Sequence, residues 1–242
     1  MVTEHDPAPV VTFHDGLAVL RDDLLPGGTK RRFLTPILRS IPEPAVAYAG
    51  PSEGYAQLAL GHTAKETGHE VHYFVAARTT DHPLVTQGRS LGVQYHQIKP
   101  GYLTVLEKRA RDWVAESPTE RVLLPLGLHS PQFHAYAVEA IRDAAKALPP
   151  TITAVWVAWG SGLLATAIRD AIPHVHVHAV VVGRAPKTDP GPRITLYQHP
   201  DPFSRKARVP PPYPSAANYD AKVWVYARTL GGPAHLIWNV GA

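Results

Sequence analysis

The chain has 242 residues and contains no cysteine. Without thiols it has no disulfide bridges, no thiolate metal ligands and no cysteine nucleophile, so its chemistry must use other side chains. It also lacks any apolar run of the ~18 residues that a membrane-spanning helix needs. Its first segment, "MVTEHDPAPVV", lacks the basic and then apolar pattern of a signal peptide. We therefore expect a globular cytoplasmic protein with no membrane partner.

Charged residues are also scarce, at 18% of the chain, and they leave a formal net charge of +4. This mild excess of cations is typical of a solvated surface, and it indicates an anionic partner only where the cations cluster. Hydrophobic residues make up 45%, enough for a substantial core. The 25 prolines concentrate in a few segments, notably 183–214, which we interpret as loops because periodic segments resume after each.

Short β-rich runs alternate with helical patterns along the chain. The expected strands are 17–21, 45–50, 70–76, 93–98, 121–127, 152–160, 175–183 and 235–240. The expected helices are 30–40, 52–68, 82–92, 102–117, 133–148, 162–172 and 221–230. This alternation predicts an α/β fold with parallel sheets flanked by helices, in which sites gather at the carboxyl ends of the strands.

Three turns between a strand and a helix carry glycine and polar residues: "AGPSEG" with Ser52, "LGLHSPQ", and "WGSGLLA" with Gly160, Ser161 and Gly162. Such turns expose backbone N–H groups at a helix amino terminus, where a phosphate can bind. Turns of this kind also serve as plain connections, so "GSG" needs other support before it indicates a phosphate site.

Lys30 stands at the expected start of a helix in "LRDDLLPGGTKRRFL". A cation is unfavourable near a helix amino terminus, so a merely solvated lysine is a weak explanation. Lysine forms Schiff bases with carbonyl compounds, and pyridoxal phosphate (PLP) requires both such a lysine and a phosphate cradle. The pattern therefore indicates chemistry based on an amine.

The segment "RDDLLPGGTKRRFL" resembles the signature K-R-D-D-L … G-G-N-K-x-R-K-L of fold type II PLP-dependent enzymes, in the branch of aminocyclopropane carboxylate (ACC) deaminase and D-cysteine desulfhydrase. Other segments resemble that family in the same order: "AYAGPSEGYAQLALGHTAKETG", "LLPLGLHSPQFHAYAVEAI", "VAWGSGLLATAI", "NYDAKVW" and "LIWNVGA". The resemblance implies a two-lobed fold, with 1–31 and 126–242 as the large cofactor-binding lobe and 32–125 as the small lobe. It also allows a homodimer.

The resemblance implies a role for each matched residue. Lys30 would form the Schiff base with PLP and then act as general acid or base, and Ser52 and Tyr219 would be the other catalytic residues. The cofactor contacts would be Lys30, Glu53, Gly160, Ser161, Gly162, Asp220 and Asn239. The substrate contacts would be Ser52, Gly54, Tyr55, His129 and Ser130. Ser52 as an ordinary helix cap and Tyr219 as a structural residue remain open alternatives.

Several positions depart from the family pattern. Glu53 replaces an asparagine, and its carboxylate would repel a phenolate oxygen of the cofactor. Leu163 and Leu164 replace a glycine and a threonine of the phosphate loop, and Asn239 replaces a histidine. The chain is also shorter than typical members between "WGSG" and Tyr219. These changes imply either a remodelled enzyme or the loss of catalysis.

Three functions stay open. The first is a PLP-dependent lyase or deaminase acting at the α-carbon of a small amino-acid-like substrate. The second is a PLP-dependent decarboxylase acting on an amino-acid-modified nucleobase in DNA, as in phage DNA hypermodification, which would place the protein in the host cytoplasm. Its phosphate contacts would be Arg193, Arg205, Lys206 and Arg208, in a loop that also holds Arg184 and Lys187. That loop is equally explained as solvated surface. The third is an inactive binding protein.

A histidine pattern is a separate signal. His174, His176 and His178 alternate along one expected strand, so they share a face that could present imidazoles to a metal. A half-exposed strand explains the pattern as well, and no carboxylate partner is adjacent. We therefore predict no metal.

Overall fold

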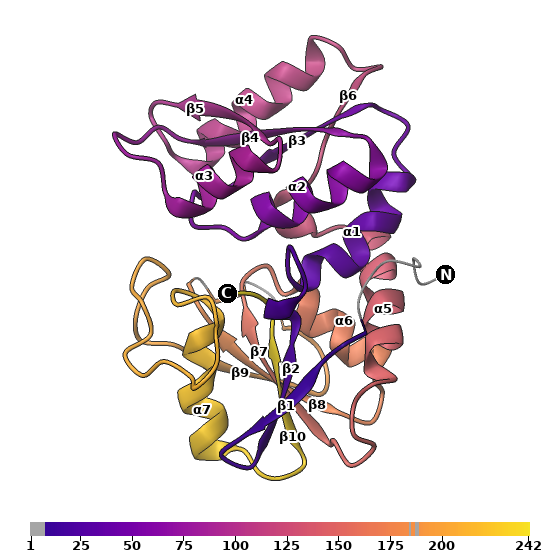
Figure 1. Ribbon diagram of the computed structural model, residues 1–242, viewed down its shortest axis with the longest axis vertical. Helices are drawn as coiled ribbons and strands as arrows, with labels where there is room; N and C mark the ends of the chain where they lie inside the picture. Colours follow the sequence, from indigo (N-terminus) through magenta and orange to yellow (C-terminus); the bar gives the residue numbers. More distant parts are fainter. Residues whose placement is uncertain (1–7, 184, 187–188) are drawn as a thin grey trace. The chain divides into compact units, whose positions relative to one another are not determined.

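The computed structural model describes residues 8–183, 185–186 and 189–242, and these form two compact units (Figure 1). The first unit contains residues 1–32 and 131–242, and the second contains residues 33–130. Residues 1–7, and with them most of the segment examined for a targeting signal, lie outside the described residues, as do Arg184 and Lys187.

A six-stranded sheet forms the centre of the first unit. Its order is β1 (Val11–His14), β2 (Leu17–Arg21), β10 (His235–Asn239), β7 (Ala154–Trp159), β8 (His176–Val181) and β9 (Ile194–Gln198). β1 runs antiparallel to β2, and the other five strands are parallel. The carboxyl ends of these five strands therefore lie along one edge of the sheet, where a site is expected.

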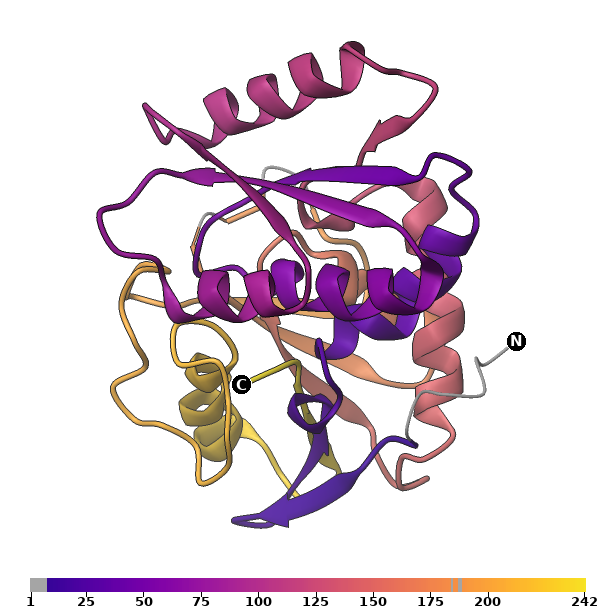
Figure 2. The ribbon, with the colours of Figure 1, turned by 45° about the horizontal axis from the view of Figure 1, so that its top comes forward.

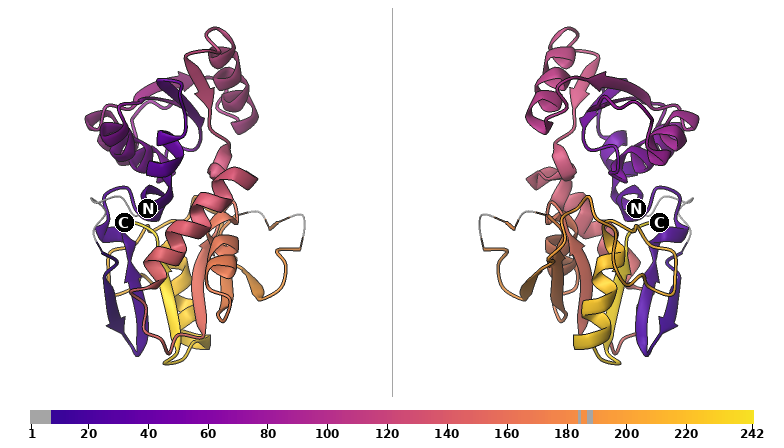
Figure 3. Two further views of the ribbon diagram at one scale, coloured as in Figure 1. Left: turned by 90° about the vertical axis from the view of Figure 1, so that its right-hand side faces the viewer. Right: turned by 90° about the vertical axis from the view of Figure 1, so that its left-hand side faces the viewer.

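Helices cover both faces of this sheet. The first unit contains η1 (Asp22–Leu24), α5 (Pro131–Ala145), α6 (Leu163–Ala171), η3 (Asp220–Lys222), α7 (Val223–Leu230) and the start of α1 (Thr29–Arg39). The opposite views of Figure 3 show α5 in front of the sheet in one and α7 in front in the other. All six residues of β7 are buried, as expected for a parallel strand covered on both sides.

The second unit has a smaller sheet that is parallel throughout. Its order is β5 (Gln94–Ile98), β4 (Glu70–Ala76), β3 (Ala45–Ala49) and β6 (Arg121–Leu123). Its helices are the larger part of α1, α2 (Ala56–Thr67), α3 (Pro83–Ser90), α4 (Leu103–Ala115) and the short η2 (Leu126–Leu128). In Figure 2 the strands run between α4 on one side and α2 and α3 on the other.

The structure corrects the expected elements at three places. β9 lies inside the segment interpreted as a proline-rich loop: "ITLYQ" is rich in β-branched and aromatic residues and pairs with β8. β1 was not expected at all, and it forms a hairpin with β2. α2 begins at Ala56, so Ser52 lies in the turn before the helix and does not cap it. Within the described residues, no helix combines the length and apolar character needed to cross a membrane.

Candidate active site

Buried polar contacts fix the turn that carries Lys30. Gly27 and Gly28 have φ of 91° and 70°, values that L-residues rarely adopt, and they direct the chain into α1. Asp22, which is fully buried, accepts a hydrogen bond of 2.7 Å from the Thr29 hydroxyl. Arg32 donates from two guanidinium nitrogens to the same carboxylate. The start of α1 is therefore held to η1 by charge-assisted hydrogen bonds.

Trp238 extends this network to the end of β10. Its indole N–H lies 3.1 Å from Asp22 Oδ2 and 3.0 Å from the Thr29 hydroxyl. The backbone N–H of Thr29 also donates to the Val240 carbonyl at 3.0 Å. The start of α1, with Lys30 as its second residue, thus lies beside the carboxyl end of a central strand.

Lys30 and Asp220 form an electrostatic pair at this edge of the sheet. Burial lowers the pKa of the Lys30 amine, and the charge of Asp220 opposes that shift. Burial raises the pKa of Asp220 to about 8, against the charge of Lys30 and backbone N–H groups of Val240 and Gly241. Among the residues that the structure describes, Asp220 Oδ1 is buried without a hydrogen-bond partner. A buried carboxyl oxygen without a partner is costly, so a group that forms a hydrogen bond with it would stabilise the site.

The turn between β7 and α6 forms a close-packed glycine loop, Gly160–Gly162. Gly162 has φ of 87°, and a Cβ there would lie 2.5 Å from the Trp159 ring, so only glycine fits. A Cβ on Gly160 would lie 2.8 Å from the hydroxyl of Tyr219. The loop leads into the nine-residue α6, whose first N–H groups have no partner inside the helix. This geometry suits a phosphate.

Tyr219 packs on this loop. Its hydroxyl donates to the Ala158 carbonyl at 3.2 Å, and burial raises its pKa well above the ordinary value. The two leucines that depart from the family pattern both lie in the first turn of α6, and Leu163 is buried. Backbone N–H groups do not depend on side-chain identity, so these leucines leave the cradle in place. The first unit therefore fits PLP: an amine, a phosphate cradle and a carboxylate oxygen awaiting a donor.

The side chain of Asn239 already has hydrogen-bond partners within the protein. Its amide group donates to Asp23 Oδ1 at 2.7 Å and to the Pro214 carbonyl at 2.9 Å, and its Oδ1 accepts from Ser215 at 2.7 Å. Both amide protons are used by these two bonds. Asn239 thus joins β10 to the segment before Tyr219, and a direct contact with a cofactor would require one of these bonds to break.

The second unit carries the predicted residues Ser52 to Tyr55 in the turn after β3. Ser52 is buried, and its hydroxyl donates to Glu53 Oε2 at 2.9 Å. Gln57, fully buried in α2, donates to the Ser52 and Gly54 carbonyls at 2.8 and 2.7 Å. The turn is therefore fixed from inside the unit by one amide side chain.

The side chain of Glu53 carries an ionised carboxylate. Burial would raise its pKa, but the hydrogen bond from Ser52 and the charge of Arg78 outweigh burial, so the pKa lies below its usual value. Arg78, which follows β4, forms an ion pair with Glu53 Oε1. The carboxylate is thus ionised and neutralised by a cation of the same unit.

His129 and Ser130 follow β6, which lies beside β3 in the sheet. The N–H of Gly127 donates to the hydroxyl of Tyr48 at 2.8 Å, so the segment after β6 is linked to strand β3. His129 is exposed, and both turns leave the same edge of the parallel sheet. The five predicted substrate contacts therefore gather at one edge of the second unit.

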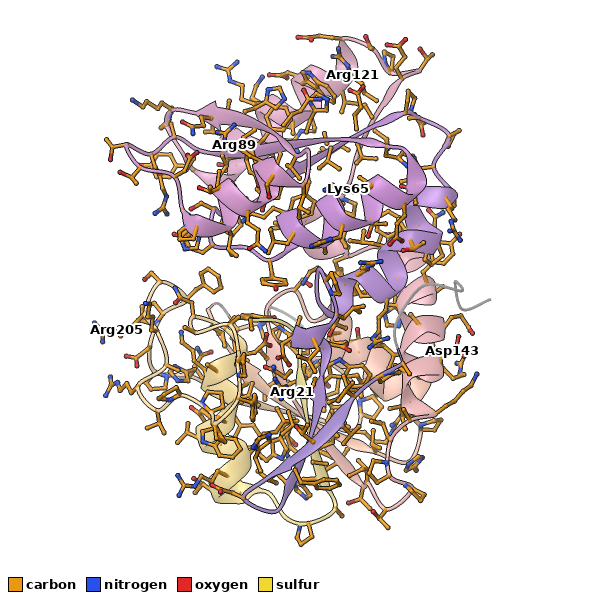
Figure 4. The ribbon with its side chains drawn as sticks, viewed as in Figure 1. Arg21, Lys65, Arg89, Arg121, Asp143 and Arg205 are labelled. Atoms are coloured by element: carbon orange, nitrogen blue, oxygen red, sulfur yellow. The ribbon has the colours of Figure 1, made fainter. Side chains whose placement is uncertain are left out.

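Three of the four predicted phosphate contacts have partners inside the protein. The Arg193 guanidinium donates to the backbone carbonyls of Val175 and Arg169. Arg205 and Arg208 both form ion pairs with the buried Asp201, at 3.0 and 2.9 Å. Lys206 is exposed, and Figure 4 shows Arg205 projecting outward from its loop.

His174 lies in a turn before β8, so of the predicted histidine face only His176 and His178 belong to the strand, where they form part of an aromatic array. His178 stacks on Trp156 at 4.3 Å and on His235 at 5.7 Å, and its Nδ1 lies 3.0 Å from the Tyr197 hydroxyl. In the part of the chain that the structure describes, no cluster of three histidines or carboxylates is arranged to hold a metal ion.

Sequence patterns did not indicate Asp22, Trp238, Gln57 or Arg78. Asp22 and Trp238 meet from positions far apart in the chain, so no local motif joins them.

No protein-family model matches this sequence, and no curated protein matches it either. Several solved structures do resemble it. An ACC deaminase homologue is 15% identical, with a TM-score of 0.82 over 99% of this chain and 91% of that chain. O-acetylserine sulfhydrylase isoform 3 from Entamoeba histolytica is 12% identical, with a TM-score of 0.73 over 98% and 86%. A pyridoxal 5'-phosphate-dependent aspartate racemase is 14% identical, with a TM-score of 0.58 over 73% and 58%. The predicted α/β fold, with parallel sheets flanked by helices, is confirmed, and the chain shares its fold with these structures.

Proposed function

We propose that this chain is a PLP-dependent lyase or deaminase that acts at the α-carbon of an amino-acid-like substrate, in the branch of ACC deaminase and D-cysteine desulfhydrase. The main support for this proposal is that burial lowers the pKa of the Lys30 amine. Lys30 belongs to the same unit as Asp220 and the glycine loop Gly160–Gly162. A lower pKa leaves more of the amine neutral near pH 7, and a neutral amine is the form that adds to an aldehyde.

When bound, PLP takes up the electron pair left at the α-carbon after a bond there breaks. The loop Gly160–Gly162 and the first turn of α6 would hold its phosphate through backbone N–H groups, although the N–H of Gly160 already donates to the Tyr219 hydroxyl. Asp220 Oδ1 would accept the hydrogen bond that it lacks, from the ring nitrogen. Lys30 Nζ would hold the cofactor and move the proton at the α-carbon. Tyr219, packed on the loop, would keep the cradle in shape.

The test is an absorbance titration of the protein with PLP. We expect a band near the visible edge in the intact chain and none in Lys30→Ala. Lys108→Ala is the matched control, because Lys108 is an exposed lysine paired with Asp112. Reduction with borohydride should then leave the cofactor mass on the peptide that contains Lys30. A band of equal strength in Lys30→Ala would contradict the proposal.

The predicted substrate contacts Ser52, Gly54, Tyr55, His129 and Ser130 belong to this proposal. Glu53, which departs from the family pattern, is ionised and paired with Arg78. Screening of small amino acids with the PLP-loaded protein identifies the bond that breaks: release of ammonia indicates a deaminase, and release of carbon dioxide indicates a decarboxylase.

A decarboxylase acting on an amino-acid-modified nucleobase in DNA is the second candidate. Exposed Arg205, Lys206 and Arg208 on one loop favour it, although Asp201 neutralises part of that charge. Binding of a duplex that carries amino-modified bases would weaken steeply between 50 and 200 mM salt, whereas a free amino acid would show little salt dependence.

The binding-protein alternative is decided by the same titration. Absence of a band in the intact chain would favour it over both enzymes. Assembly as a homodimer and a place in the cytoplasm, or in a host cytoplasm, stay predictions.

A further inference from the structure

A separate pocket of about 470 Å³ lies within the first unit, between the loop 199–209 and the segment 221–230 of η3 and α7. Its volume falls in the range of small-molecule sites, roughly 300–1,000 Å³. The pocket does not include Lys30 or the glycine loop. It therefore needs an explanation other than the proposed PLP chemistry.

Apolar side chains form most of the pocket wall. Val225, Tyr226 and Leu230 come from one face of α7, and Val209 comes from the facing loop. Val209, Val225 and Leu230 are 47%, 40% and 54% exposed, which is unusual for aliphatic side chains grouped around one hollow. An apolar body placed there would remove this surface from water.

The polar end of the pocket carries an excess of positive charge. Lys222 lines it with a side chain that is only 1% exposed, and its Nζ donates to the Pro202 carbonyl at 2.8 Å. Arg208 and the buried Asp201 also line it, and Arg205 pairs with the same carboxylate. Three cations thus face one carboxylate.

A buried ammonium without a carboxylate of its own is expensive. Burial lowers the pKa of Lys222, and the charge of Asp201 only partly offsets this. No carboxylate in the described chain forms an ion pair with Lys222, because Asp201 pairs with the two arginines. An anionic group that enters the pocket would supply the missing counter-charge.

We propose that this pocket binds a small amphipathic anion, with its apolar body against α7 and its carboxylate or comparable anionic group at Lys222 and Arg208. The proposal is independent of PLP binding, so it stands or falls separately from the proposed function. Lys222 is the last residue of η3 and follows Asp220 of the candidate active site by two positions.

The probes are 4-phenylbutyrate and its neutral analogue 4-phenylbutanol, titrated calorimetrically into the full chain. We expect the carboxylate to bind at least tenfold more tightly than the alcohol. Lys222→Met should weaken carboxylate binding about tenfold and leave alcohol binding within twofold. The control Arg228→Met removes one cation from α7 outside the pocket, where Arg228 pairs with Asp15, and should change neither affinity.

Loss of the fold in Lys222→Met would be visible by circular dichroism, and a second variant then decides. Val225→Glu places a carboxylate on an exposed α7 position at the pocket wall and should weaken binding of 4-phenylbutyrate more than tenfold. The proposal is overturned if neither probe binds, if both bind equally, or if Val225→Glu and Arg228→Met behave alike.

Discussion

At the scale of single residues, Asp220 is far from its ordinary protonation state. Its pKa is raised to about 8 by burial, and one of its oxygens lacks a donor. A protein keeps such a group only where something compensates for the cost. The neighbouring Lys30 compensates in part, and a bound ring nitrogen would complete the compensation.

Asp220 should make the cofactor-free protein less stable as pH rises. A carboxyl whose folded pKa lies above its unfolded pKa contributes stability that is complete below pH ~4 and is lost as pH rises through 8. Asp220→Asn cannot ionise and should lack this loss. The difference in unfolding free energy between Asp220→Asn and the intact chain should grow by on the order of 1–3 kcal/mol from pH 5 to pH 8.

Urea unfolding at the two pH values measures this difference. Asp143→Asn is the control, because Asp143 is a surface carboxyl paired with Lys146 and labelled in Figure 4. Parallel pH slopes for Asp220→Asn and the intact chain would show that Asp220 does not titrate in this range.

At the scale of elements, the turn before α6 combines two constraints at Gly162. Its φ of 87° is unfavourable for any other residue, and the Trp159 ring leaves no room for a Cβ. Gly16, in the β1–β2 hairpin, has φ of 79° with open space around it. A comparison of substitutions at the two glycines therefore separates the cost of backbone strain from the cost of steric overlap.

Gly162→Ala should destabilise the protein more than Gly16→Ala. Strain alone costs about 1–2 kcal/mol, and overlap with a buried ring adds about 1–3 kcal/mol. Gly162→Ala should also weaken PLP binding, because the loop must shift away from Trp159. Urea unfolding and the absorbance titration test the two effects, and equal destabilisation by both substitutions would show that the loop relaxes freely.

Much of this architecture could be predicted from local patterns, because strand and helix periods alternate clearly. The glycines and Lys30 mark the start of α1, and "GSG" marks the start of α6. β9 was missed because its five residues lie in a segment rich in prolines, although "ITLYQ" has the composition of a strand and pairs with the preceding strand β8. The delayed start of α2 depends on Gln57 binding the preceding turn, a contact that no spacing rule reports.

The residues of the candidate site could likewise be predicted only in part from the sequence. The family resemblance selects Lys30, Asp220 and the glycine loop, because those residues are close to recognisable motifs. It also selects Asn239, whose amide the structure assigns to Asp23 and Pro214. An asparagine near a site and an asparagine inside a structural network look alike in a sequence, since only the fold reveals the partners.

At the scale of the whole molecule, histidines with lowered pKa values make the fold less stable in acid. Burial lowers the pKa of His72, His96, His178, His199 and His235, that of His178 to about 4. The unfolded chain therefore binds more protons than the folded chain as pH falls through 6.5, so stability is lost on acidification. The carboxyls of Asp170 and Asp201, whose pKa values are lowered by hydrogen bonds, add to this loss at lower pH.

His178→Gln should reduce this acid sensitivity. The loss of unfolding free energy from pH 7 to pH 5 should shrink by about 1 kcal/mol relative to the intact chain, after allowance for screening by solvent. Urea unfolding at both pH values checks the result. His174→Gln, at an exposed position beyond the array, should leave the loss unchanged. The expectation fails if the two variants respond identically to acid.

The position of β10 has a consequence for synthesis on the ribosome. β10 is made after every other strand described here, yet it lies between β2 and β7 in the finished sheet. The β1–β2 hairpin and the β7–β8–β9 group therefore have no native neighbour in common until residues 235–239 leave the exit tunnel. The second unit, encoded entirely within 33–130, has no such delay. β10 lies in the middle of the larger sheet but is made after the strands on both sides of it. The same holds for Trp238, which secures the start of α1.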